Sequence, residues 1–149
     1  MNEASITQYI TDTFDGVEIA ATEGYTFFFY GPGRKLPFAT LATKDNDYDR
    51  ASNLDRPGVY RLNIGVSPAT YRSLFGPQPS RPGADGVVDT GHDFTTLDQI
   101  LPHPVYAPQS WVCVLSPSDA TFQAVQPLLA EAYDLAIRRH AKARPADES

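Results

Sequence analysis

An arginine and an asparagine on one predicted strand are the first candidates for chemistry in this sequence. Apolar side chains alternate through residues 59 to 66, so Arg61 and Asn63 project together from the face opposite to Leu62 and Ile64. A guanidinium beside an amide can hold a carboxylate or a phosphate through charge-assisted hydrogen bonds. The alternatives are a solvated face, or an ion pair between Arg61 and an acidic residue on a neighbouring strand.

Two histidines lie in segments rich in proline and glycine, where functional groups are often held. His92 follows Gly91, and His103 stands between Pro102 and Pro104. Either imidazole can serve as a general base, and Arg61 with Tyr30 can then stabilise developing negative charge. The other reading is that His103 only hydrogen-bonds backbone. The spacing of these groups is poor for a metal site, and we predict no metal and no cofactor.

Aromatic residues supply the remaining ligand-binding candidates. Besides Arg61 and Asn63, the predicted ligand-binding residues are Phe28, Tyr30, Tyr106 and Trp111. The strand at residues 25 to 30 is aromatic on both faces, and we expect the face with Phe28 and Tyr30 to be covered and pocket-like. The alternative for Trp111 is core packing. Cys113, between two valines, is expected to be buried and unreactive.

The familiar catalytic motifs are missing from the sequence. There is no P-loop, no G-x-G-x-x-G, no H-E-x-x-H, no G-x-S-x-G and no pair of cysteines. Asp45, Asp47 and Asp49 alternate as in a calcium loop, but the required glycine and the late glutamate are absent. The sequence alone therefore names no reaction.

Composition limits the partners of the chain. The 149 residues suit one domain, and 42% hydrophobic residues with a single cysteine predict a folded, soluble, cytoplasmic protein without disulfides. A net charge of −6 argues against nucleic acid and anionic membranes as partners. Neither a signal peptide nor a run of about 20 apolar residues is found. The expected assembly is a monomer or a homodimer joined through a strand edge.

Periodicity predicts an α+β fold with a mostly antiparallel sheet of about five strands and helices packed mainly on one face. The expected strands cover residues 17–21, 25–30, 38–43, 59–66 and 111–115. An N-terminal helix over 5–14 capped by Ser5, a short middle helix after Ser67, and a long C-terminal helix capped by Ser118 are expected, with Pro127 kinking or splitting the last. Residues 94–101 are predicted to form a helical turn or two. We expect one domain over 1–144 and a frayed tail over 145–149.

Several strings together resemble a known family. These are TFFFY, PFATLATKD, DRPGVYRLNIGVS, SLFG, DFTTLDQILPHPVYA, WVCVLSPSDATF and LLAEAYDLAIRRH, which cover nearly the whole chain. They are similar to a bacterial family, abundant in actinomycetes, that is known only as a domain of unknown function. More distantly, the order of elements with His103, Pro104 and Trp111 resembles the MmcQ/YjbR group, whose fold is similar to frataxin and CyaY. DNA binding has been suggested for that group, but the acidic balance here argues against it.

Two functions remain open at this point. The first is a small binding domain in which the sheet face with Arg61 and Asn63, together with the loop from Gly76 to Gly91, encloses a small organic ligand, an anionic one included, or a partner segment. The second is a cofactor-independent enzyme of secondary metabolism, such as a cyclase, isomerase or hydrolase, in which His103 or His92 is the general base and Arg61 assists.

Overall fold

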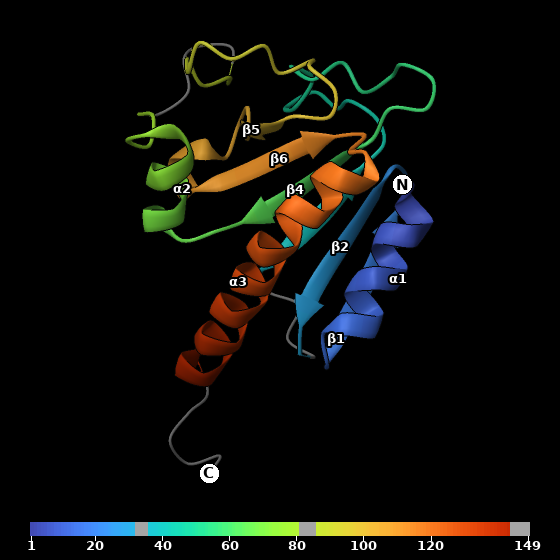
Figure 1. Ribbon diagram of the computed structural model, residues 1–149, viewed down its shortest axis with the longest axis vertical. Coiled ribbons are helices and arrows are strands. Elements are labelled where there is room, and N and C mark those ends of the chain that lie inside the picture. Colours follow the sequence, from blue (N-terminus) through green and yellow to red (C-terminus); the bar gives the residue numbers. More distant parts are fainter. Residues whose placement is uncertain (32–35, 81–85, 144–149) are drawn as a thin grey trace.

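An antiparallel sheet forms the centre of the molecule in the computed structural model, which describes residues 1–31, 36–80 and 86–143 (Figure 1). Its six strands in the described chain are β1 (Val17–Thr22), β2 (Tyr25–Tyr30), β3 (Ala39–Ala42), β4 (Arg61–Gly65), β5 (Ile100–Pro102) and β6 (Trp111–Leu115). They lie in the order β1-β2-β3-β4-β6-β5, and every pair of neighbours is antiparallel. The predicted α+β class is confirmed, with one strand more than expected.

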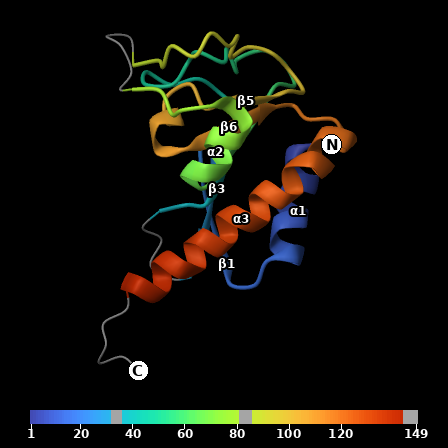
Figure 2. The ribbon, with the colours of Figure 1, turned by 60° about the vertical axis from the view of Figure 1, so that its left-hand side comes forward.

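In the described part of the chain, three α-helices pack on this sheet: α1 (Glu3–Thr13), α2 (Pro68–Phe75) and α3 (Asp119–Ala143). Figures 1 and 2 show α1 and α3 side by side along the sheet, and the rings of Tyr9 and Phe122 join them edge to face with centroids 5.2 Å apart. Within the described residues, none of these helices has the combination of length and apolar character that a membrane crossing requires.

The main hydrophobic core lies between the helices and one face of the sheet. Helices α1, α2 and α3 contribute Ile6, Tyr71 and Phe122, while the sheet contributes alternate residues such as Phe28 and Leu62. All five side chains are at most 1% exposed. This burial explains the period of two along β4, because Leu62 and Ile64 must point into the core while their neighbours point away.

A smaller apolar cluster lies on the opposite face of the sheet. Leu54, from the loop between β3 and β4, packs there with Leu101, Cys113 and Leu115. Burial raises the pKa of Cys113 to about 12, so its thiol stays protonated and inert, as predicted. Among the described residues, no α-helix lines the pocket on this face, where the polar site described below is built.

The middle helix receives part of its N-terminal cap from α3. Ser67 is the N-cap residue of α2, and its hydroxyl accepts from the backbone N–H of Thr70. The carboxylate of Glu131 then accepts from the backbone N–H of Ser67 at 2.7 Å and from the hydroxyl of Thr70 at 2.6 Å. An acidic group at this position also complements the positive end of the helix dipole.

The start of α1 differs from the prediction, whereas the start of α3 agrees with it. Asn2, rather than Ser5, caps α1, because Asn2 Oδ1 accepts from the backbone N–H of Ser5 while the Ser5 hydroxyl accepts from that of Asn2. Ser118 does cap α3, through the backbone N–H of Thr121. Pro127 does not split α3, which continues through it.

The predicted helical turns at residues 94–101 are wrong. Asp93 Oδ1 accepts from the backbone N–H of Thr95 at 3.0 Å, and Asp98 has a φ of 58°, so local turns replace a helix. The segment then pairs with β6 as the short strand β5. Residues 81–85 of the loop from Gly76 to Gly91 lie outside the described residues, and so does the predicted frayed tail over 145–149.

Candidate functional site

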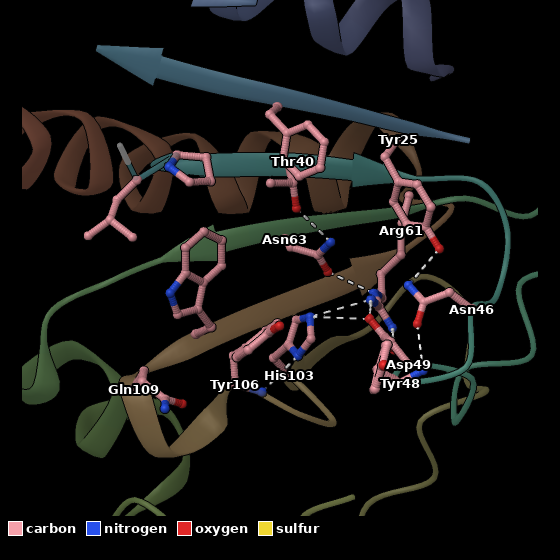
Figure 3. A pocket seen from close by; sticks show the side chains of 15 residues that line it. Tyr25, Thr40, Asn46, Tyr48, Asp49, Arg61, Asn63, His103, Tyr106 and Gln109 are labelled. Carbon is pink, nitrogen blue, oxygen red and sulfur yellow. Dashed lines mark hydrogen bonds and ion pairs between the residues drawn. The ribbon is translucent and has the colours of Figure 1, made fainter. Parts of the chain in front are cut away.

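A pocket of about 630 Å³ opens on the sheet face opposite the helices. Its residues come from four strands and from the segments between β2 and β3, between β3 and β4, and between β5 and β6; Figure 3 labels ten of them. The lining consists of Tyr25, Phe27, Leu36, Pro37, Thr40, Ala42, Asn46, Tyr48, Asp49, Arg61, Asn63, His103, Tyr106, Gln109 and Trp111. Volumes of this size are typical of small-molecule sites.

Arg61 is the centre of the polar floor of this pocket, although its side chain is only 1% exposed. Its Nη1 donates to Asp49 Oδ1 at 3.0 Å and to Ser52 Oγ at 2.9 Å, and its Nη2 donates to Asp49 Oδ2. Its Nε donates to Asn63 Oδ1 at 2.7 Å. The guanidinium is therefore held by a bidentate ion pair and two further acceptors.

This pairing keeps Arg61 charged. Burial alone lowers the pKa of Arg61, but the hydrogen bonds and the charge of Asp49 outweigh it and leave the pKa raised. One of the predicted alternatives was an ion pair between Arg61 and an acidic residue on a neighbouring strand. The ion pair is present, but its acidic partner, Asp49, lies in the loop between β3 and β4. The network continues from Asn63 Nδ2 to Thr40 Oγ1 at 2.9 Å.

His103 lies against the same group, with its Nε2 3.3 Å from Arg61 Nη2 and 3.9 Å from Asp49 Oδ2. Its Nδ1 accepts from the backbone N–H groups of Val105 and Tyr106, at 3.1 Å and 3.0 Å. Burial, and next the charge of Arg61, hold the pKa of His103 well below its ordinary value, so the ring is neutral at pH 7.

The hydrogen bonds of His103 also assign its tautomer. A nitrogen that accepts two N–H groups carries no proton, so the neutral ring carries its proton on Nε2. Neither nitrogen then offers a free lone pair to a substrate. This geometry weighs against His103 as a general base and makes it a hydrogen-bond donor on the floor of the pocket.

Aromatic side chains form the walls above this floor. The rings of Tyr25 and Phe27 are stacked along β2, with centroids 6.4 Å apart. Trp111, at the start of β6, contributes a third aromatic side chain to the lining. Trp111 covers Gly65, its partner across β4 and β6: a Cβ added at Gly65 would lie 2.9 Å from Cε2 of the indole. The absence of a side chain at Gly65 therefore allows the indole to lie against the strand.

The rim of the pocket is apolar and unusually exposed. Leu36 is 63% exposed, Tyr48 is 85% exposed and Tyr106 is 50% exposed, and all three line the opening. Exposed apolar side chains that gather around one cavity are a common sign of a binding site.

Five of the predicted site residues meet in this pocket: Arg61, Asn63, His103, Tyr106 and Trp111. The other three do not. Phe28 is fully buried in the main core, and Tyr30 lies edge to face against Tyr133 and His140 on the helix side. His92 contacts Phe75 and Thr90, away from Arg61.

Register explains the misplacement of Phe28 and Tyr30. Phe27 pairs with Thr40, and Thr40 pairs with Asn63, so the odd residues of β2 share the face of Arg61 and Asn63. Alternation within one strand cannot tell which of its faces joins which face of the next strand, and a shift of one residue exchanges them. The aromatic pocket residues that sequence reasoning missed are therefore Tyr25 and Phe27, which lie on the opposite face of β2 from Phe28 and Tyr30.

Loop residues are the second group that was missed. Asp49 and Tyr48 lie in the loop between β3 and β4, and only their tertiary contacts reveal that they complete the site. The described residues of the loop from Gly76 to Gly91 do not line the pocket. Among the residues that the structure describes, no cluster of three or more histidine, cysteine or acidic side chains is placed to hold a metal ion.

Comparison with known proteins gives a family and no activity. The sequence matches no curated protein. A crystal structure of a protein from Pseudomonas syringae is similar at 15% identity and a TM-score of 0.48, covering 91% of this chain and 99% of that one. A family model described as "Family of unknown function (DUF6194)" matches residues 1–145. With nearly its whole length matched, the chain belongs to the DUF6194 family of unknown function.

Proposed function

We propose that this domain binds a small organic molecule in the pocket over Arg61. The observation that carries the proposal is a 630 Å³ cavity with aromatic walls and a floor of buried, mutually hydrogen-bonded polar groups. The walls exclude water from a ligand and provide apolar contact, while the floor groups fix one end of it. The ligand is an apolar, ring-bearing molecule with one polar end.

Rigidity of the floor supports binding over a purely structural role for this network. Arg61 and Asn63 stand on a central strand, Thr40 stands on its neighbour, and each side chain is held by another. Groups fixed in this way before a ligand arrives lose little conformational entropy when it binds. A network that served stability alone would need no adjoining cavity.

Two finer identifications remain proposals. The distant similarity to the MmcQ/YjbR group rests on the order of the elements together with His103, Pro104 and Trp111. A cytoplasmic location is supported by the lone, buried Cys113.

Trp111 provides a direct test of ligand binding, because it is the only tryptophan and lines the pocket. The protein purified without added ligand is first weighed by native mass spectrometry, and a panel of ring-bearing fragments is then titrated against its tryptophan fluorescence. We expect a retained molecule, or at least one fragment that changes Trp111 emission saturably. A bare mass together with no saturable change would overturn the proposal.

A matched pair of leucines shows whether such a signal comes from the pocket. Leu36 lies at the rim and is 63% exposed, whereas Leu74 lies on α2 outside the pocket and is 42% exposed. Leu36→Ser should weaken fragment binding by roughly fivefold, as expected for the loss of about 1 kcal/mol of apolar contact. Leu74→Ser should leave it unchanged, and equal effects of the two changes would contradict a site in this pocket.

A further inference from the structure

Four of the five N–H donors of Arg61 are already occupied, which limits the kind of ligand that its pocket can take. The guanidinium has five N–H groups; four of them donate to Asp49, Ser52 and Asn63, and the fifth, on Nη2, faces the protonated Nε2 of His103, which cannot accept it. Because Arg61 is only 1% exposed, an anionic ligand could not gain a second N–H group of Arg61 without displacing the Asp49 carboxylate from a buried ion pair. Arg61 is thus a poor receptor for a carboxylate or phosphate in this arrangement.

Asp49 is the charged group with acceptor capacity to spare. A carboxylate offers about four acceptor sites, and Asp49 uses two of them for Arg61. Its side chain is 15% exposed, compared with 1% for Arg61, and it lines the pocket. A ligand that reaches the floor therefore meets the negative partner of this ion pair more readily than the positive one.

The aromatic walls of the pocket also favour a ligand with a positive charge. Five aromatic residues line the pocket, namely Tyr25, Phe27, Tyr48, Tyr106 and Trp111. The negative face of an aromatic ring attracts ammonium and guanidinium groups, with tryptophan and tyrosine the strongest. Trp111 and Tyr48 make no ring contact with another described aromatic residue, which leaves faces of their rings for a ligand.

The loop at the mouth of the pocket and the molecule as a whole both carry a negative net charge. The loop between β3 and β4 holds four aspartates, at 45, 47, 49 and 55, against Lys44, Arg50 and Arg56. The chain as a whole carries a net charge of −6. Both fields raise the local concentration of cations and lower that of anions.

From these observations we propose that the pocket selects organic cations: a protonated or quaternary nitrogen on an apolar, ring-bearing body. The nitrogen lies against Asp49 and the aromatic walls, while the apolar body lies against Phe27 and Trp111. This inference rests on the proposed small-molecule function and narrows it, and it reverses the expectation from the sequence that an anion is among the ligands of Arg61.

Three probes of nearly equal size test the sign of charge directly. 2-Phenylethylamine is a cation at neutral pH, 2-phenylethanol is neutral and 3-phenylpropionate is an anion, and all three carry the same phenyl group. Each is titrated against the emission of Trp111 in the wild-type protein, with excitation selective for indole. We expect the amine to bind about tenfold more tightly than the alcohol, and the propionate to bind more weakly than both.

Two variants identify the groups responsible. Asp49→Asn removes the charge and should bring the affinity ratio of amine to alcohol close to one. Because this change also leaves Arg61 without its ion pair, Tyr48→Leu serves as a second variant: Tyr48 is 85% exposed, so the fold does not depend on it. Tyr48→Leu should lower the same ratio about threefold by removing a ring face, while Leu74→Ser should leave it at the wild-type value.

The outcomes separate this inference from the function on which it rests. If the alcohol or the propionate binds as tightly as the amine, charge selection is overturned and small-molecule binding stands. The same holds if the three probes fail while neutral or anionic fragments of the panel bind. If neither the probes nor the panel bind, the proposed function falls and this inference falls with it.

Discussion

Arg61 is a buried charge, and its environment shows how such a charge is tolerated. Moving an ion out of water costs several kcal/mol unless partners replace its hydration. Asp49 supplies the opposite charge, and Ser52 and Asn63 supply the remaining acceptors. The strand therefore carries an arginine at a position where an isolated charge would oppose folding.

Removal of one member of the Arg61–Asp49 ion pair should destabilise the fold more than replacement of both by apolar residues. We expect Asp49→Ala to lower the free energy of unfolding by about 3 kcal/mol, because it leaves Arg61 buried and uncompensated. The double change Arg61→Met with Asp49→Leu should cost less, since two apolar side chains need no partners. Urea denaturation of the two variants measures the difference, and a double variant less stable than the single one would refute this account.

The neutral state of His103 predicts an acid-sensitive fold. Its pKa is lowered in the folded protein, so the unfolded chain binds the proton more readily. The stability associated with this group is complete above the ordinary histidine pKa of about 6.5 and is lost as the pH falls below it, by up to about 1.4 kcal/mol per pH unit.

His103→Gln isolates this contribution, because glutamine keeps a polar side chain but does not titrate. Arg61 and Asp49, the charged groups that face His103, are present in both proteins. Urea unfolding between about pH 7 and pH 5 should show a steeper loss of stability for the wild type than for the variant. Parallel slopes would mean that His103 is not held neutral by the fold.

Pairing of β4 with β6 places a glycine under the only tryptophan. We expect Gly65→Ala to displace the indole of Trp111, because the new Cβ would lie 2.9 Å from Cε2. The displacement should shift the emission spectrum of Trp111 and lower stability by about 1–3 kcal/mol, as for other overpacked sites. In a Trp111→Leu background the same change should be neutral or slightly stabilising, since alanine loses less entropy than glycine on folding. Denaturation of the four proteins of this cycle measures the coupling, and an equal cost in both backgrounds would contradict the contact.

The long helix α3 contains an internal proline that it does not need for packing. Pro127 is exposed, and its ring removes one backbone donor from the helix interior. We expect Pro127→Ala to raise the free energy of unfolding by about 1–3 kcal/mol, because helix propensity improves and no buried contact is lost. Thermal unfolding checks this, and an unchanged or lower melting temperature would be the opposing result.

Local patterns predicted most elements but not how neighbouring strands meet. The alternation on β4 placed Arg61 and Asn63 opposite to Leu62 correctly, because both faces of that strand have a distinct character. On β2 both faces are aromatic, so only pairing with Thr40 and Ala39 shows that Phe27 faces the pocket and Phe28 the core. The strand β5 was missed because three residues are too few for a period to be seen.

One face of the sheet packs in the main core and contributes most to stability, whereas the other face carries the proposed binding pocket. Phe28→Ala should cost about 3–5 kcal/mol, because the ring is fully buried in the main core. Phe27→Ala, one residue away, should cost much less because its ring is only partly buried, but it should weaken fragment binding. Denaturation and Trp111 titration of both variants test this division, and similar effects on both measurements would argue against it.

The site as a whole could not be assembled from the sequence because its parts lie far apart along the chain. Asp49 precedes Arg61 by 12 residues, and His103 follows it by 42. Neither spacing matches a local motif, and the acidic loop resembled only an incomplete calcium site. Arg61, Asn63 and His103 were identified one by one from their unusual positions, while their common location depends on the pairing of β4 with β6 and of β6 with β5.

The cap that α3 provides for α2 has a consequence for synthesis of the chain. Glu131 binds the backbone N–H of Ser67 across 64 positions, and it is translated long after α2 is complete. On the ribosome, the start of α2 must rely on the hydroxyl of Ser67 and on water until the first half of α3 has emerged. A nascent chain arrested before Glu131 would carry α2 without this cap, so the middle helix reaches its final form only after the first half of α3 has been made.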